Sequence, residues 1–149
     1  MQRGCVIATI SGALVILVVS VLYFLFVWPD QQRKGTSACI YVIEKAMGEY
    51  EADFGSLPEG GNGQVAALLL GDNTREKSYL TSKSVVLRNG QFTDFWKNPL
   101  RFGTDEEGRP QVLSAGPNGV FGDDDDIDSQ LVREMIRIEA EKDSTTNAS

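Results

Sequence analysis

One uncharged apolar run constrains the N-terminal part of this chain more than any other feature. It extends from Cys5 to Trp28 and contains no Asp, Glu, Lys or Arg. A transmembrane helix needs about 20 such residues, so the run is long enough to cross a bilayer. A cleavable secretory signal has an apolar core of about 7–15 residues and ends in small residues, whereas this run ends in bulky aromatic ones. We therefore predict a retained single-pass anchor at residues 5–28, preceded by a short N-terminus or leader at 1–4.

The charges that flank the run do not set its orientation. Arg3 precedes it, while Arg33 and Lys34 follow it and are partly offset by Asp30. The positive-inside rule therefore favours neither orientation.

Composition limits what the rest of the chain does. The 149 residues leave room for one modest domain after the anchor, and the formal net charge of −7 argues against a nucleic-acid partner. The absence of His removes the commonest general base, and we find no nucleophile or phosphate-binding motif, so we predict no enzyme and no small-molecule substrate. Any metal would be held by oxygen atoms, which suit calcium or magnesium. Cys5 and Cys39 are interpreted as small buried hydrophobes rather than a disulfide.

An amphipathic helix is predicted over residues 36–53. Its apolar residues recur at steps of three and four: Cys39, Ile40, Ile43, Met47, Tyr50 and Phe54. Pro29 is expected to end or bend the preceding helix, and Thr36 or Ser37 to cap this one. Gly55 and Pro58 stop it.

Shorter elements follow this helix. Residues 64–70 predict a short buried helix closed by Gly71. Runs at 84–88, 100–103 and 111–114 predict strands, with turns at Asn89-Gly90 and Glu107-Gly108. Three short antiparallel strands packed against a long helix form an α+β domain.

A second amphipathic helix is predicted at the C-terminus, over residues 129–142. Its apolar residues share one side of a helical wheel: Leu131, Val132, Met135, Ile136 and Ile138. Asp128 or Ser129 is a suitable cap, and the apolar side would pack on the domain or on a partner. The small polar residues at 143–149 predict a disordered tail.

Between the last strand and this helix lies a loop with an unusual concentration of charge. Four consecutive aspartates, 123–126, follow Gly116, Gly119 and Gly122. Two carboxylates about 4 Å apart repel by about 4 kcal/mol at an effective dielectric of about 20. Either the loop is mobile and its charges face water, or a bound cation draws them together. The spacing excludes an EF-hand.

The order of three motifs resembles the major (G-type) pseudopilins of bacterial type II secretion. Tyr50-Glu-Ala-Asp-Phe-Gly-Ser-Leu-Pro58 is similar to the family's Tyr-x-x-Asp-x-Gly-x-Tyr-Pro. Thr93-Asp-Phe-Trp-Lys-Asn-Pro99 is similar to Asp-Pro-Trp-Gly-Asn-Pro. Ser114-Ala-Gly-Pro-Asn-Gly119, with Asp124-Asp-Asp-Ile127, is similar to the calcium loop Ser-x-Gly-x-Asp-Gly … Asp-x-Asp-Ile.

The resemblance implies a pilin-like fold, with a globular domain at 29–128 that lies in the periplasm and an anchor in the bacterial inner membrane. It implies partners that are other pseudopilins or copies of the same chain, joined through the N-terminal helix, together with secretion-system components. It also implies a structural Ca²⁺. The implied ligands are side chains of Asn118, Asp124, Asp125 and Asp126, carbonyls of Leu113 and Val120, and Ser114, with Asp123 as an acidic neighbour or substitute.

The chain departs from the family pattern at its N-terminus. Family precursors have Gly followed by Phe-Thr-Leu-Ile-Glu, whereas here Gly4 is followed by Cys-Val-Ile-Ala and then Thr9 in place of the glutamate. That glutamate registers one subunit against the next in a filament. The alternative hypothesis is therefore an unprocessed, anchored adaptor or binding module of the same fold that does not enter a filament. Asn118 also replaces the usual Asp, which keeps an oxygen ligand but removes a charge.

Overall fold

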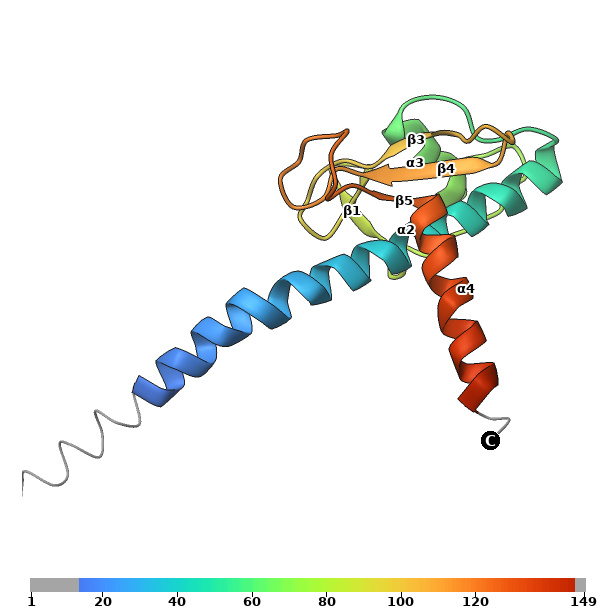
Figure 1. Cartoon of the computed structure of the whole chain (residues 1–149). Coiled ribbons are helices and arrows are strands. Elements are labelled where there is room, and N and C mark those ends of the chain that lie inside the picture. Colours follow the sequence, from blue (N-terminus) through green and yellow to red (C-terminus); the bar gives the residue numbers. More distant parts are fainter. Residues whose placement is uncertain (1–13, 147–149) are drawn as a thin grey trace, which may run out of the picture. The chain divides into compact units, whose positions relative to one another are not determined.

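The computed structural model describes residues 14–146, and the chain divides into two compact units, 1–34 and 35–149 (Figure 1). The predictions that concern Cys5, Thr9 and residues 1–4 lie outside the described residues. Over the described part the chain is α+β, with a long N-terminal apolar helix, short antiparallel strands and a C-terminal helix. The predicted α+β class is confirmed, and the pilin-like arrangement stays a prediction.

The first unit is helical throughout its described residues. Residues 14–22 are α-helical, Tyr23–Val27 form the π-helix η1, and α2 (Trp28–Phe54) follows without a break. The whole helix, Leu14–Phe54, is long and apolar enough to cross a membrane by length and composition. Its apolar side chains from Leu14 to Trp28 are exposed, as those of a lipid-facing helix are.

Pro29 was expected either to end or to bend the helix, and it does not end it. A proline inside a helix has no N–H to donate and its ring crowds the carbonyl four residues earlier. The structure places a π-helical turn directly before Pro29, in which the Trp28 N–H bonds the Tyr23 carbonyl. The wider turn accommodates the ring, and the helix continues.

The second unit is built on the C-terminal part of α2. The predicted apolar stripe is buried there, and Ile40 and Ile43 are completely inaccessible to solvent. Each such side chain contributes about 1.5–3 kcal/mol through burial. Thr36 and Ser37 do not cap a helix start, because both are buried inside the continuous helix. The Thr36 hydroxyl instead accepts a hydrogen bond from the Phe95 N–H at 3.2 Å.

The predicted ends of α2 and of the next helix are confirmed. α2 ends at Phe54, and Gly55 follows with a φ of +78°. Helix α3 (Asn62–Leu70) ends at Gly71 with a φ of +118°, which only glycine adopts without strain. The Asn62 side chain joins α3 to the strands. Its Nδ2 donates to the Phe92 carbonyl at 2.8 Å and to the Leu100 carbonyl at 2.7 Å.

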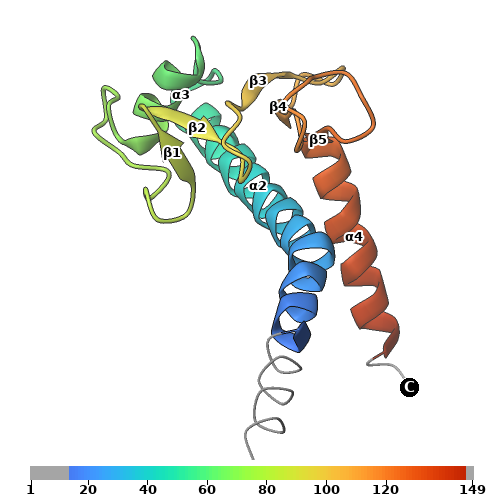
Figure 2. The same cartoon turned by 90° about the vertical axis from the view of Figure 1, so that its left-hand side faces the viewer.

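The strands form two small antiparallel sheets (Figure 2). Strands β1 (Val86–Arg88) and β2 (Gln91–Thr93) form a hairpin, and β3 (Arg101–Thr104), β4 (Pro110–Ser114) and β5 (Ile127–Asp128) form a sheet in that order. The predicted strands correspond to β1, β3 and β4. Strands β2 and β5 were missed: β5 has only two residues, and β2 was not separated from the motif at 93–99 that follows it.

The hairpin turn is confirmed in detail. Asn89 and Gly90 connect Arg88 to Gln91, and both have a positive φ, +52° and +75°. A two-residue turn with positive φ at both positions matches the natural twist of a hairpin.

Helix α4 (Ser129–Thr146) begins directly after β5. The Asp128 carboxylate accepts a hydrogen bond from the Leu131 N–H at 2.7 Å, so Asp128 is the cap, as predicted. The helix extends beyond the predicted end at 142 and through most of the expected disordered tail, because Asp, Ser and Thr have only moderately unfavourable helix propensities. Residues 147–149 lie outside the described part.

Candidate functional site

The candidate site begins with a buried carboxylate that holds two loops together. Asp94 follows β2 and is fully buried. Its Oδ2 accepts a hydrogen bond from the Ser114 hydroxyl at 2.7 Å, and its Oδ1 accepts one from the Asn98 N–H at 2.8 Å. The Asn98 side chain in turn donates to the Gly116 carbonyl at 2.7 Å. The turn at 94–98 is thereby joined to the start of the glycine- and aspartate-rich loop.

Gly116 lies where two parts of this loop pass each other closely. Its φ is +60°, and a Cβ at this position would be 2.4 Å from the Asp125 carbonyl oxygen. No side chain fits in this space without displacing the backbone of residue 125. Glycine is therefore required for the backbone conformation and also for the close approach.

The side chains of the loop form a polar cluster. The Asn118 Nδ2 donates to Asp123 Oδ2 at 2.7 Å and to Asp125 Oδ1 at 3.0 Å, while its Oδ1 accepts from the Val120 N–H at 2.6 Å. A hydrogen bond between the two carboxyl groups lowers the pKa of Asp123 and raises the pKa of Asp125. The Asn118 amide thus bridges the two carboxyl groups, and the Asp125 N–H also donates to Asp123 Oδ1 at 3.3 Å.

The implied calcium ligands are partly brought together. Asn118 is in contact with Asp125 and with Asp123, which the resemblance implied as an acidic neighbour or a substitute ligand. Asp126 turns toward the Gly122 N–H, which donates to its Oδ2 at 2.7 Å. Asp124 is exposed to solvent.

Two further implied ligands belong to β4. Leu113 pairs with Asp128 in the sheet. The hydroxyl of Ser114 is already bonded to Asp94 and also accepts the Gly116 N–H at 3.2 Å. Among residues 14–146, no three acidic or sulfur-bearing side chains converge closely enough to hold a metal. The complete ligand set thus stays a prediction.

The chemistry of the cluster nevertheless fits a hard cation. Asp126 Oδ1 is buried and has no hydrogen-bond partner, so one ligand oxygen is unsatisfied. Turning the Asn118 amide by half a turn would bring its oxygen beside Asp123 and Asp125, at the cost of the hydrogen bond that this oxygen now accepts from the Val120 N–H. That rotation would supply the oxygen-rich environment that Ca²⁺ prefers. A divalent charge would also offset the repulsion between the carboxylates of Asp123 and Asp125.

A separate cluster secures the end of α2. The Asp53 carboxylate accepts hydrogen bonds from Lys77 Nζ at 2.5 Å and from the Tyr79 hydroxyl at 2.7 Å, and these bonds lower the pKa of Asp53. Desolvation and the bond to Asp53 raise the pKa of Tyr79 to about 12. Tyr79 also meets the Tyr50 ring edge-on, with centroids 5.5 Å apart. The first motif of the resemblance therefore ties the helix end to the segment at 72–79.

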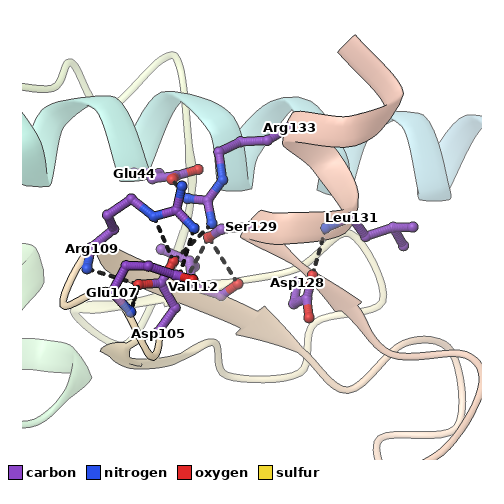
Figure 3. A network of polar contacts seen from close by, with 9 residues as sticks. All are labelled: Glu44, Asp105, Glu107, Arg109, Val112, Asp128, Ser129, Leu131 and Arg133. Atoms are coloured by element: carbon purple, nitrogen blue, oxygen red, sulfur yellow. Dashed lines mark hydrogen bonds and ion pairs between the residues drawn. The ribbon is translucent and has the colours of Figure 1, made fainter. Parts of the chain in front are cut away.

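A third network joins three elements around Arg133 (Figure 3). Its guanidinium pairs with Glu44 of α2 and, at 3.1 Å, with Asp105 of the β3–β4 turn. Desolvation raises the pKa of Glu44, although Arg133 opposes this. Desolvation also acts to raise the pKa of Asp105, but the hydrogen bonds from Arg109 outweigh it and lower that pKa. The network fixes the first turn of α4 to the domain.

Beside this network is an open groove of about 390 Å³ lined by Tyr41, Glu44, Lys45, Arg109, Pro110 and Arg133. Glu44 is the one acidic residue in this lining and three are basic, of which Arg109 and Arg133 are already paired with acidic side chains. Sequence patterns did not reveal the network, because its members are far apart in the chain.

Comparisons with protein-family models, curated proteins and solved structures found no match to this chain. The site must therefore be interpreted from its own geometry and from the motifs of the sequence.

Proposed function

We propose that this chain is a membrane-anchored, pseudopilin-like structural subunit of a type II secretion-type apparatus. Its apolar helix would lie in a bacterial inner membrane and pack with copies of itself or with other pseudopilins, while its domain would lie in the periplasm. The proposed role is structural rather than catalytic. A calcium ion would stabilise the loop between β4 and β5.

One observation carries this proposal: two of the three motifs of the resemblance meet in space. Asp94 and Asn98, from the second motif, bond directly to Ser114 and Gly116, from the third. The two bonded pairs are 20 and 18 positions apart in the sequence. A chance similarity of two short motifs would not require them to contact each other. The uninterrupted helix from Leu14 to Phe54 also suits a subunit that packs side by side with others.

The mass of the intact protein extracted from membranes tests the proposed assembly role. A subunit that enters a filament is expected to lose Met1–Gly4 and to carry a methyl group on the new N-terminal amine of Cys5. An unprocessed mass would contradict the filament role. That result would favour the second candidate, an anchored adaptor of the same fold, which Thr9 in place of the family glutamate already favours.

Calcium binding is tested separately by thermal unfolding of the full chain in detergent after treatment with EDTA. Calcium at about 100 times its Kd should stabilise the domain by about 2.7 kcal/mol, which raises Tm by about 10 °C. Magnesium should have a smaller effect, because it requires a tighter octahedral site. Asp126→Asn should reduce the rise, and Asp72→Asn, an exposed position outside the loop, should not.

A Tm that does not change with calcium, together with no calcium uptake in equilibrium dialysis, would exclude the metal. It would leave the assembly role intact, because that role depends on the processed N-terminus.

A further inference from the structure

Most of helix α4 projects from the domain without packing on it. Figures 1 and 2 both show α4 leaving the end of β5 and extending away from the two sheets. Val132 in its first turn is buried, but every side chain from Glu134 to Ser144 is exposed. An isolated helix shorter than about 12–15 residues is only marginally stable in water. A projecting helix of about three turns therefore gains much of its stability when another surface covers it.

The exposed part of α4 has an apolar stripe. Leu131, Met135 and Ile138 are spaced by four and three residues, which places them on one face of the helix. Their exposed fractions are 43%, 39% and 40%. Alternating steps of four and three are the spacing by which one helix packs along another.

Acidic side chains lie on both sides of this stripe. By the period of 3.6 residues, Glu134 and Glu141 follow one edge and Glu139 the other, while Lys142 is the next position along the stripe and the exposed Ile136 lies beyond Glu139. Arg137 pairs with Glu134 at 2.6 Å from the side away from the stripe, and Arg133 is turned into the domain. Pairing with α4 of a second copy would place glutamates opposite glutamates, which is unfavourable. Residues 134–144 carry four acidic and two basic side chains, and this net negative charge disfavours an anionic lipid surface.

We propose that this stripe docks an amphipathic helix of a partner protein that carries Lys or Arg on both sides of its own apolar stripe. The apolar side chains supply the contact area, and the flanking charges select the partner and its register. The net charge of −7 on the chain favours the same kind of partner at longer range. This surface is distinct from the calcium loop, and it acts whether or not the chain enters a filament.

The test uses the full chain in nanodiscs and two labelled synthetic helices. Both peptides carry Leu and Ile at the a and d positions, and they differ only in having Lys or Glu at e and g. We expect the Lys-flanked peptide to bind at least about tenfold more tightly than the Glu-flanked one, with affinity falling as salt is added.

Three variants assign the binding to this face of α4. Combining Met135→Ser with Ile138→Ser should abolish binding of the Lys-flanked peptide. Ala140→Ser, on the opposite face, should leave it unchanged, although it lowers helix propensity more than an Ile→Ser change does. Exchanging Glu134 and Glu139 for Lys should reverse the preference, so that the Glu-flanked peptide binds. A gain of binding cannot result from misfolding.

Three results would overturn the proposal. The first is equal binding of the two peptides, and the second is concentration-dependent pairing of the chain through α4 in the absence of peptide. The third is protection of the α4 amides from hydrogen exchange in nanodiscs of phosphatidylethanolamine and phosphatidylglycerol without peptide. That protection would show that lipid covers the stripe.

Discussion

Replacing Asp94 by Ala is expected to destabilise the domain by about 3 kcal/mol. The carboxylate is fully buried and accepts hydrogen bonds from Ser114 and Asn98, and bonds to a charged acceptor contribute about 1.5–3 kcal/mol each. Alanine would remove both bonds and leave the buried Ser114 O–H and the partly buried Asn98 N–H without acceptors. Near-UV circular dichroism, which reports on the half-buried Trp96 two residues away, should show Tm falling by more than about 10 °C.

Asp94→Asn is the control variant, because asparagine keeps the shape of the side chain and removes its charge. Its amide oxygen can still accept from the Asn98 N–H, and its NH₂ can donate to the Ser114 oxygen once the hydroxyl turns. The loss should therefore be smaller, about 1 kcal/mol. Asp72→Ala removes an exposed aspartate and should change Tm little. Equal losses for Asp94→Ala and Asp72→Ala would show that the buried carboxylate does not hold the two loops together.

Local patterns predicted local structure well in this chain. The stripe on α2, the left-handed glycine after α3, the Asn89-Gly90 turn and the Asp128 cap are each set by a few adjacent residues. Predictions from local patterns failed where the surrounding structure outweighed the local preference. Thr36 and Ser37 have good capping side chains, but the helix that precedes them continues through Pro29 and buries both.

The residue types of the candidate site could be predicted from the sequence, but the contacts between them could not. The aspartates and glycines of the loop identified it as a possible cation site, and Asn118, Asp123 and Asp125 do lie together. The burial of Asp94 could not be read from the sequence, because its partners are brought to it by the pairing of distant segments. The same applies to Arg133, which bonds a residue 89 positions earlier in the chain.

Among glycine-to-alanine substitutions in the loop, Gly116→Ala is expected to lower the free energy of unfolding most. An L-residue in the left-handed region costs about 1–2 kcal/mol, and the new Cβ would also collide with the Asp125 carbonyl oxygen at 2.4 Å. Because that oxygen belongs to the backbone, the loop must shift to admit the methyl group, at a further cost of about 1–3 kcal/mol. Thermal unfolding should therefore report a total loss of about 2–5 kcal/mol.

Gly108→Ala separates the two contributions to this loss. Gly108 lies in the β3–β4 turn with a φ of +77°, and a Cβ there would have no atom within 4 Å. Its substitution should cost only the conformational strain, about 1–2 kcal/mol. The difference in the free energy of unfolding between the two variants measures the cost of a Cβ at the close approach of residues 116 and 125. If it is zero, the two parts of the loop do not pass in contact. If it is large, the crossing also positions the Asp125 carboxylate, and any rise of Tm with calcium should shrink in Gly116→Ala but persist in Gly108→Ala.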